Sequence, residues 1–209
     1  ESLRPQDEVS LFTFAGETQW LARPTTDKAA VAKALDALQP GGATAVLDAL
    51  YAALVLPQTQ GRILLVLFTD GEDNMSWLEW RQMRVVAERA NALIHVVGLK
   101  RAEEGGAPMP AMDLSGRMLP MTGTPSMEFL HTWGMRQIAE STGGRYWEAE
   151  SPARLKSAFA AITETMSQRY ILSYEPQGVK RPGWHEIELR LLGRTGDIHA
   201  RRGYWVGAR

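Results

Sequence analysis

The first half of the chain alternates short apolar stretches with longer amphipathic ones. The stretch VSLFTF at residues 9–14 is rich in β-favouring residues and predicts a strand, with residues 18–22 as its hairpin partner. Residues 63–68 (ILLVLF) and 93–99 (LIHVVGL) are apolar without alternation, which is typical of strands covered on both faces. We expect residues 63–68 to be the most buried strand, in the middle of a parallel sheet.

Five stretches with helical spacing lie between and after these strands. Thr26 or Asp27 can cap the first, Ser76 can cap the third, and Ser151 followed by Pro152 opens the fifth. The expected helices span residues 26–38, 44–56, 77–91, 127–141 and 152–167. The strand–helix–strand rhythm predicts an α/β fold with a doubly wound, mostly parallel Rossmann-like sheet.

Two regions depart from this rhythm. Residues 101–126 are rich in Gly, Pro and Met, show no convincing period, and predict a long loop. After a short strand at residues 145–148 and the fifth helix, the tail alternates at residues 169–174, 185–191 and 197–206, which predicts an antiparallel meander. We therefore divide the chain into an α/β domain at residues 1–167 and an antiparallel β extension at residues 168–209.

Composition narrows the possible partners. The 209 residues include 23 Lys and Arg and 24 Asp and Glu, and the net charge is −1. This balance leaves no basic excess for nucleic acid or for an anionic membrane surface. No stretch approaches the roughly 20 apolar residues of a membrane-spanning helix. Because the sequence has no cysteine, disulfides, thiolate metal sites and cysteine nucleophiles are excluded.

Two polar loops are candidates for chemistry because ligands bind outside the carboxyl ends of strands in an open parallel sheet. Residues 41–44 (GGAT) precede a helix, and residues 69–73 (TDGED) follow the 63–68 strand. The Asp70 carboxylate and the Thr44 hydroxyl are oxygen ligands of the kind that Mg²⁺ or Mn²⁺ takes. The alternative is structural: Asp-Gly is a common turn, and Gly-Gly-x-Thr a common loop with a cap.

The order of several motifs resembles a von Willebrand factor type A domain, and most closely a bacterial branch described as VWFA-related. These motifs are FTF at 12–14, GGAT at 41–44, LDAL at 47–50, VLFTDGEDN at 66–74, TGGR at 142–145, RYILSYEP at 169–176 and RGY at 202–204. The resemblance implies a Rossmann-type sheet with a metal-ion-dependent adhesion site. In that site an Asp-x-Ser-x-Ser motif, a Thr and a second Asp hold a divalent cation, and Thr44 and Asp70 match the last two.

The Asp-x-Ser-x-Ser motif of the family is not found in this sequence. In the family it follows the first, central strand, and the resemblance implies that residues 1–7 are the end of the helix after that strand and the turn into the next strand. We therefore expect the natural polypeptide to continue upstream of Glu1 and to complete the site. By itself, this chain is expected to bind Mg²⁺ or Mn²⁺ weakly or not at all, and Glu72 and Asp73 are expected to be solvated.

Enzyme signatures are missing from the sequence. It contains no dinucleotide-binding, phosphate-loop or nucleophile-elbow motif and no His-Glu-x-x-His spacing. His95 lies inside LIHVVGL, where a core or edge histidine is the favoured interpretation. A hydrolase with Asp70 as nucleophile is the third hypothesis for the function, after two kinds of binding module.

Both binding hypotheses involve a protein partner. Trp77 and Trp80 follow the acidic loop, and five methionines, with Met112 and Met118 among them, lie in or beside the 101–126 loop. These residues either pack the loop against the body or form a protein-binding surface beside the metal-site rim. The first hypothesis is metal-assisted adhesion or assembly, and the second is a metal-free scaffold that binds through the 101–126 loop and the tail sheet. The resemblance implies export to the periplasm, the cell surface or the medium.

Overall fold

The structure, a computed structural model, describes residues 3–15, 17–39, 41–56, 61, 63–99, 127–179 and 181–207. Its strands are β1 (Val9–Phe14), β2 (Thr18–Thr25), β3 (Ile63–Thr69), β4 (Ala92–Leu99), β5 (Tyr146–Ala149), β6 (Gly183–Glu186) and β7 (Gly203–Val206). Its helices are α1 (Lys28–Asp36), α2 (Val46–Val55), α3 (Trp80–Arg89), α4 (Met127–Ser141) and α5 (Pro152–Ser167). The α/β fold expected from the sequence is confirmed.

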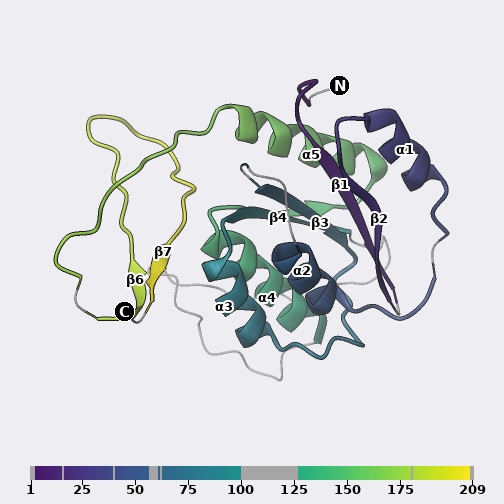
Figure 1. The fold of residues 1–209 in the computed structure, drawn as a ribbon, viewed down its shortest axis with the longest axis horizontal. Helices are drawn as coiled ribbons and strands as arrows, with labels where there is room; N and C mark the ends of the chain where they lie inside the picture. Colours follow the sequence, from purple (N-terminus) through teal and green to yellow (C-terminus); the bar gives the residue numbers. More distant parts are fainter. Residues whose placement is uncertain are drawn as a thin grey trace.

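The central sheet has three parallel strands in the order β3-β4-β5. Helices cover both of its faces: α5 packs on one, and α2, α3 and α4 pack on the other (Figure 1). Successive side chains of β3 point to opposite faces, and Leu65 and Leu67 belong to the core under α2, α3 and α4. Leu64 and Val66 pack on the α5 side instead.

The prediction that residues 63–68 form the most buried strand is wrong in detail. β4 lies between two strands, and seven of its eight residues are buried. β3 is at the edge of the described three-stranded sheet, its first four residues are only half-buried, and Phe68 is 38% exposed. Both segments are continuous apolar runs, and this pattern does not reveal which of the two has a neighbour on each side.

β1 and β2 form a separate antiparallel hairpin beside the sheet. Among the described residues, β1 and β3 share no strand pairing, although Phe14 of β1 packs against the same core as Leu65 and Leu67. The hairpin leads into α1, where the Asp27 carboxylate accepts a hydrogen bond from the Ala30 amide at 3.0 Å. Of the two caps that the sequence predicts, Thr26 or Asp27, the structure has Asp27.

Among the described residues, the tail contains one antiparallel strand pair, β6 and β7, in which the rings of Trp184 and Trp205 lie 6.1 Å apart. Residues 169–174, where a third strand was expected, form no strand in the described structure. Their apolar side chains face solvent: Tyr170 is 93% exposed and Leu172 is 70% exposed. Alternation favours a strand only where another surface takes up the apolar side chains. Tyr170 and Leu172 meet no such surface among the described elements, and of this stretch Tyr174 reaches the Tyr204 ring of β7, 5.9 Å away.

The tail is nevertheless attached to the α/β part. The Arg201 guanidinium donates hydrogen bonds to the carbonyls of Glu88 and Ala90 at the carboxyl end of α3. These are the carbonyls that a helix end leaves without partners, and a cation there is also favoured by the helix dipole. Gly143, with φ of +86°, lies so close to Ala200 that a Cβ at Gly143 would come within 2.8 Å of the Ala200 backbone. Arg201 and Gly143 thus fix residues 200–202 against the body.

Candidate functional site

Hydrogen bonds to the backbone of Thr44 hold the two predicted loops together at one rim of the sheet. The Thr44 amide donates to the Asn74 side-chain oxygen at 2.9 Å. In return, the amides of Asn74 and Met75 donate to the Thr44 carbonyl at 3.0 and 3.1 Å. Because Asn74 belongs to the loop that leaves β3 through Asp70, Thr44 and the Asp70 loop lie on the same side of the molecule. Whether Thr44 and Asp70 hold a metal stays a prediction.

The same loop caps α2. The Leu47 amide donates to the Asp73 carboxylate at 3.1 Å and to the Ser76 hydroxyl at 3.0 Å, and the Asp48 amide also donates to Ser76 at 3.2 Å. These amides at the amino end of α2 have no partner within the helix. Asp73, expected to be merely solvated, thus satisfies one of them. Ser76, expected to cap the helix that follows it, caps the preceding helix instead.

The side chain of Asp48, on α2, in turn binds the loop between β3 and α3. Its carboxylate accepts hydrogen bonds from the amides of Trp77 and Leu78 at 2.9 and 3.1 Å. These bonds keep residues 77 and 78 outside α3, which begins at Trp80 with Glu79 as its cap. The predicted start of this helix at residue 77 is therefore three residues too early. The loop between β3 and α3 is held to α2 by hydrogen bonds along most of its length.

Asp70 lies at the point where the chain leaves β3. Its carboxylate is exposed and accepts a hydrogen bond from the Glu72 amide at 3.3 Å. Gly71 has φ of +89°, a conformation that a residue with a side chain rarely adopts, and this allows the sharp turn after the strand. The buried Thr69 hydroxyl accepts a hydrogen bond from the Gly71 amide at 3.1 Å.

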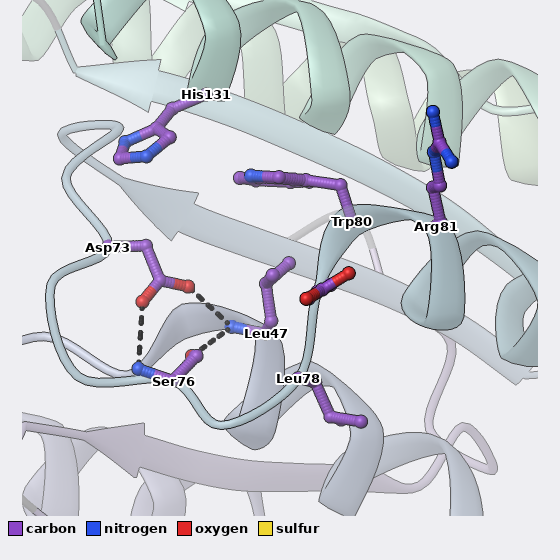
Figure 2. A pocket seen from close by; sticks show the side chains of 8 residues that line it. Leu47, Asp73, Ser76, Leu78, Trp80, Arg81 and His131 are labelled. Carbon is purple, nitrogen blue, oxygen red and sulfur yellow. Dashed lines mark hydrogen bonds between the residues drawn. The ribbon is translucent and has the colours of Figure 1, made fainter.

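A pocket of about 400 Å³ opens beside this loop (Figure 2). Asp73 and Ser76 line one side, Leu47 and Leu78 form part of its apolar wall, and Trp80 and His131 lie opposite them. Nδ1 of His131, on α4, is 3.0 Å from the Gly71 carbonyl. His131 was not among the predicted site residues, because it lies 60 residues after Gly71 in the sequence and no motif includes it.

The two predicted tryptophans differ in environment. Trp80 is half-buried and packs against Gly134 of α4, where a Cβ would come within 2.5 Å of the indole ring. Trp77, three residues earlier, is 94% exposed. Packing of Trp80 helps to hold α3 against α4, whereas Trp77 is available at the surface. Met112 and Met118, together with the whole 101–126 loop, lie outside the described residues.

The donors at the rim can be compared with what a divalent cation requires. Mg²⁺ takes six oxygen ligands in near-octahedral geometry. Thr44 and Asp70 offer one hydroxyl and one carboxylate, and no group of three or more His, Asp or Glu within the described ranges is arranged to hold a metal ion. Among the described residues, Thr44 and Asp70 therefore offer two of the six oxygen ligands, and weak or absent Mg²⁺ binding by this chain stays a prediction.

Comparisons with known proteins agree with the fold. Residues 1–72 match the family model of the von Willebrand factor type A domain. UPF0353 proteins of Mycobacterium leprae and Mycobacterium marinum are 23% and 24% identical to the chain over 202 residues. The matches cover 91% and 92% of this chain but 56% of each relative, so the chain spans little more than half of their length.

Two solved structures are similar in fold. The conserved hypothetical protein BatB of Bacteroides thetaiotaomicron gives a TM-score of 0.56 with 18% identity, over 80% of this chain and 82% of that one. An aerotolerance-related membrane protein of Bacteroides fragilis gives 0.51 with 19% identity, over 77% and 81%. Within the described part of the present chain, no helix is both long and apolar enough to cross a bilayer.

Proposed function

We propose that this chain, which resembles the von Willebrand factor type A domain and matches it over residues 1–72, is a non-catalytic module that binds a protein partner at the rim formed by the Thr44 and Asp70 loops. The observation that carries the proposal is the exposed Trp77 on a loop whose backbone is held to α2 by the Asp48, Asp73 and Ser76 side chains.

The rim has two properties that favour protein recognition. Binding by an already ordered loop loses little conformational entropy, and the hydrogen bonds to Asp48, Asp73 and Ser76 order this loop before any partner arrives. A tryptophan that is 94% exposed offers a large apolar area to bury, and tryptophan is among the residues that contribute most to binding energy in interfaces. The neighbouring pocket offers both apolar and polar groups to a side chain of the partner.

The experiment begins by identifying the partner at this rim. A photo-crosslinking amino acid at position 77 is introduced into the natural protein in its own cells, with Leu35, 54% exposed on α1, as the matched control position. We expect a protein that crosslinks from position 77 and not from position 35. The proposal is wrong if both positions give the same crosslinked proteins or if position 77 gives none.

Purified proteins then test the rim quantitatively. We expect Trp77→Ala to weaken binding of the identified partner at least tenfold, because truncation of a central aromatic side chain costs about 2 kcal/mol or more and about 1.4 kcal/mol is tenfold in affinity. Leu35→Ala, which removes an apolar side chain that is 54% exposed on α1, should leave the affinity unchanged. Equal losses in the two variants would assign the binding to another surface.

The proposal also includes a divalent cation bound at this rim. Thr44 and Asp70 would supply two oxygen ligands to Mg²⁺ or Mn²⁺, and the remaining ligands would come from water, from the partner, or from residues outside those described. Calorimetric titration of either metal into the natural protein and into Asp70→Ala tests this. Equal metal affinities in the two proteins would reject Asp70 as a metal ligand and would not affect the proposal that the rim binds a protein.

The exposed tail supports a second candidate, the metal-free scaffold. Tyr170, Ile171 and Leu172 are 93%, 67% and 70% exposed, a concentration of apolar surface that is typical of interfaces. In that case, replacing Tyr170 and Leu172 with Ser would weaken partner binding, whereas Trp77→Ala would not. Export is part of both candidates, and protease treatment of intact cells would test it, because an exported protein is cleaved while a cytoplasmic marker survives.

A further inference from the structure

A second pocket, of about 350 Å³, lies at the opposite end of the parallel strands from the rim. The rim loops follow the carboxyl end of β3, whereas this pocket lies at the amino end of the parallel strand β5, between the α4–β5 turn and tail residues 198–202. One wall is the turn at Gly143 and Gly144, and the tail forms the other. Because Arg201 fixes the tail to the end of α3, both walls are already in place without a ligand.

The side chains around this pocket are mainly cationic. Arg136, Arg145, Arg202 and His199 line it, and Glu140 is the carboxylate that faces them. Arg202 pairs with Glu140 at 2.6 Å, and Arg136 lies 3.7 Å from Glu148 of β5. Three guanidinium groups thus meet two carboxylates, with an imidazole beside them. Among the described residues, no carboxylate is within ion-pair distance of Arg145.

Two of the guanidinium groups are held by aromatic rings. The Arg136 guanidinium lies 5.1 Å from the centre of the Tyr146 ring, and that of Arg145 lies 4.9 Å from Trp147. Stacking on a ring occupies the face of a guanidinium and leaves its N–H edge available to an anion. It also restricts the side chain, so less rotamer entropy remains to be lost when a ligand binds.

We infer that this pocket binds a small ligand with a carboxylate or phosphate group, and that Arg145 and Arg202 are its main contacts. Guanidinium groups match both oxyanions in geometry and charge. The volume exceeds that of a single oxyanion, which leaves room for the body of a small organic acid or phosphate ester. This inference is independent of the protein-binding rim.

A competing explanation is purely structural. The carboxyl end of α4 carries the negative end of the helix dipole, and it could satisfy the nearby cations together with Glu140. The two explanations predict different results for anion binding. If the pocket accepts an anion, Glu140 competes with that anion for Arg202, and removing its charge should tighten binding. If Glu140 and the helix end fully compensate the cations, no anion should bind at all.

The experiment is a titration of the isotope-labelled protein with sodium phosphate and, separately, sodium succinate. Ionic strength is kept constant with sodium chloride, because screening alone changes electrostatic binding. The signals followed are the amides of Gly143 and Gly144 and the indole N–H of Trp147, which donates to Nδ1 of His95 at 3.1 Å. We expect saturable shifts of these signals with phosphate, with succinate or with both, and the better probe identifies the class of oxyanion.

Variants distinguish a specific anion site from a general attraction of anions to positive charge. We expect Arg145→Gln to weaken binding about tenfold, since it removes a charge-assisted contact, and Glu140→Gln to tighten binding severalfold. Arg154→Gln, which removes an exposed charge from α5, is the matched control and should change nothing. Thermal unfolding of each variant shows that it is folded.

Three results would overturn the inference. One is the lack of saturable shifts with both probes up to about 0.1 M, a concentration at which salt already screens surface charges strongly. Another is an equal loss of affinity in Arg145→Gln and Arg154→Gln, which would show non-specific attraction. The last is weaker rather than tighter binding in Glu140→Gln, which would show that Glu140 supports the site structurally.

Discussion

Acidification should destabilise this protein through His95, which lies in the middle of β4 and is only 1% exposed. Its Nδ1 accepts hydrogen bonds from the Arg145 amide and from the Trp147 indole, both at 3.1 Å. The neutral ring therefore carries its proton on Nε2, which is buried and has no hydrogen-bond partner among the described residues. Burial lowers the pKa of His95 to about 4, and the positive charges of Arg169 and Arg145 add to the effect.

The magnitude follows from the difference in pKa between the folded and the unfolded chain. The ordinary histidine pKa is 6.5, so between pH 6.5 and about 4 the unfolded chain binds more protons at this position than the folded chain. The stability that neutral His95 preserves is complete above pH 6.5 and is lost as the pH falls through this window. At about 1.4 kcal/mol per pKa unit, the loss reaches about 3 kcal/mol near pH 4.

The assay is urea unfolding of the natural protein and of His95→Gln at several pH values from 7.5 to about 4.5. His95→Gln is less stable at pH 7.5, but its free energy of unfolding should fall less on acidification, because it has no group to protonate there. His185→Gln, on β6 outside both core clusters, is the control and should keep the steep dependence. Parallel pH profiles of the natural protein and His95→Gln would refute the reasoning.

Three further changes test the packing around the two pockets. Ser76→Ala removes a hydroxyl acceptor from the amino end of α2 and should lower the free energy of unfolding by about 1 kcal/mol, or the melting temperature by about 2–4 °C. Gly144→Ala would place a Cβ 1.8 Å from the Ile94 carbonyl and should cost more than about 3 kcal/mol in urea unfolding, whereas Gly41→Ala meets nothing within 4 Å and should cost little. Arg201→Met removes the hydrogen bonds to the α3 carbonyls and should speed amide exchange and proteolysis in the tail without unfolding the α/β part. Protection of the tail equal to that in the natural protein would show that Arg201 does not hold it.

The elements with local signals could be predicted from the sequence. Asp27 caps α1, and Ser151 caps α5 with Pro152 in its first turn, as expected, because each of these side chains bonds an amide three residues away. The turn at Gly143 likewise ends α4 where the sequence places it. In each case the partner lies within a few residues along the chain, and a pattern in the sequence is sufficient.

The hydrogen bonds that shape the rim could not be predicted in this way. Ser76 has the residue type and position of a cap for the helix that follows, yet its hydroxyl accepts hydrogen bonds from amides 28 and 29 residues earlier. Asp48 looks like an ordinary acidic residue in the first turn of a helix, yet it orders the loop at Trp77 and Leu78. Both roles depend on how β3 and α2 lie side by side, which only the tertiary structure determines.

The mismatch between the sequence of β3 and its burial is itself informative. An uninterrupted run such as ILLVLF indicates a strand with cover on both faces, and β3 has this cover from α5 on one side and from α2, α3 and α4 on the other. Burial also depends on the strand's own edges, and β3 pairs only with β4 among the described strands. Phe68 is consequently 38% exposed although its ring lies 6.3 Å from that of Phe159. A strand paired along the open edge of β3 would bury the apolar side chains that the ILLVLF pattern predicts to be interior.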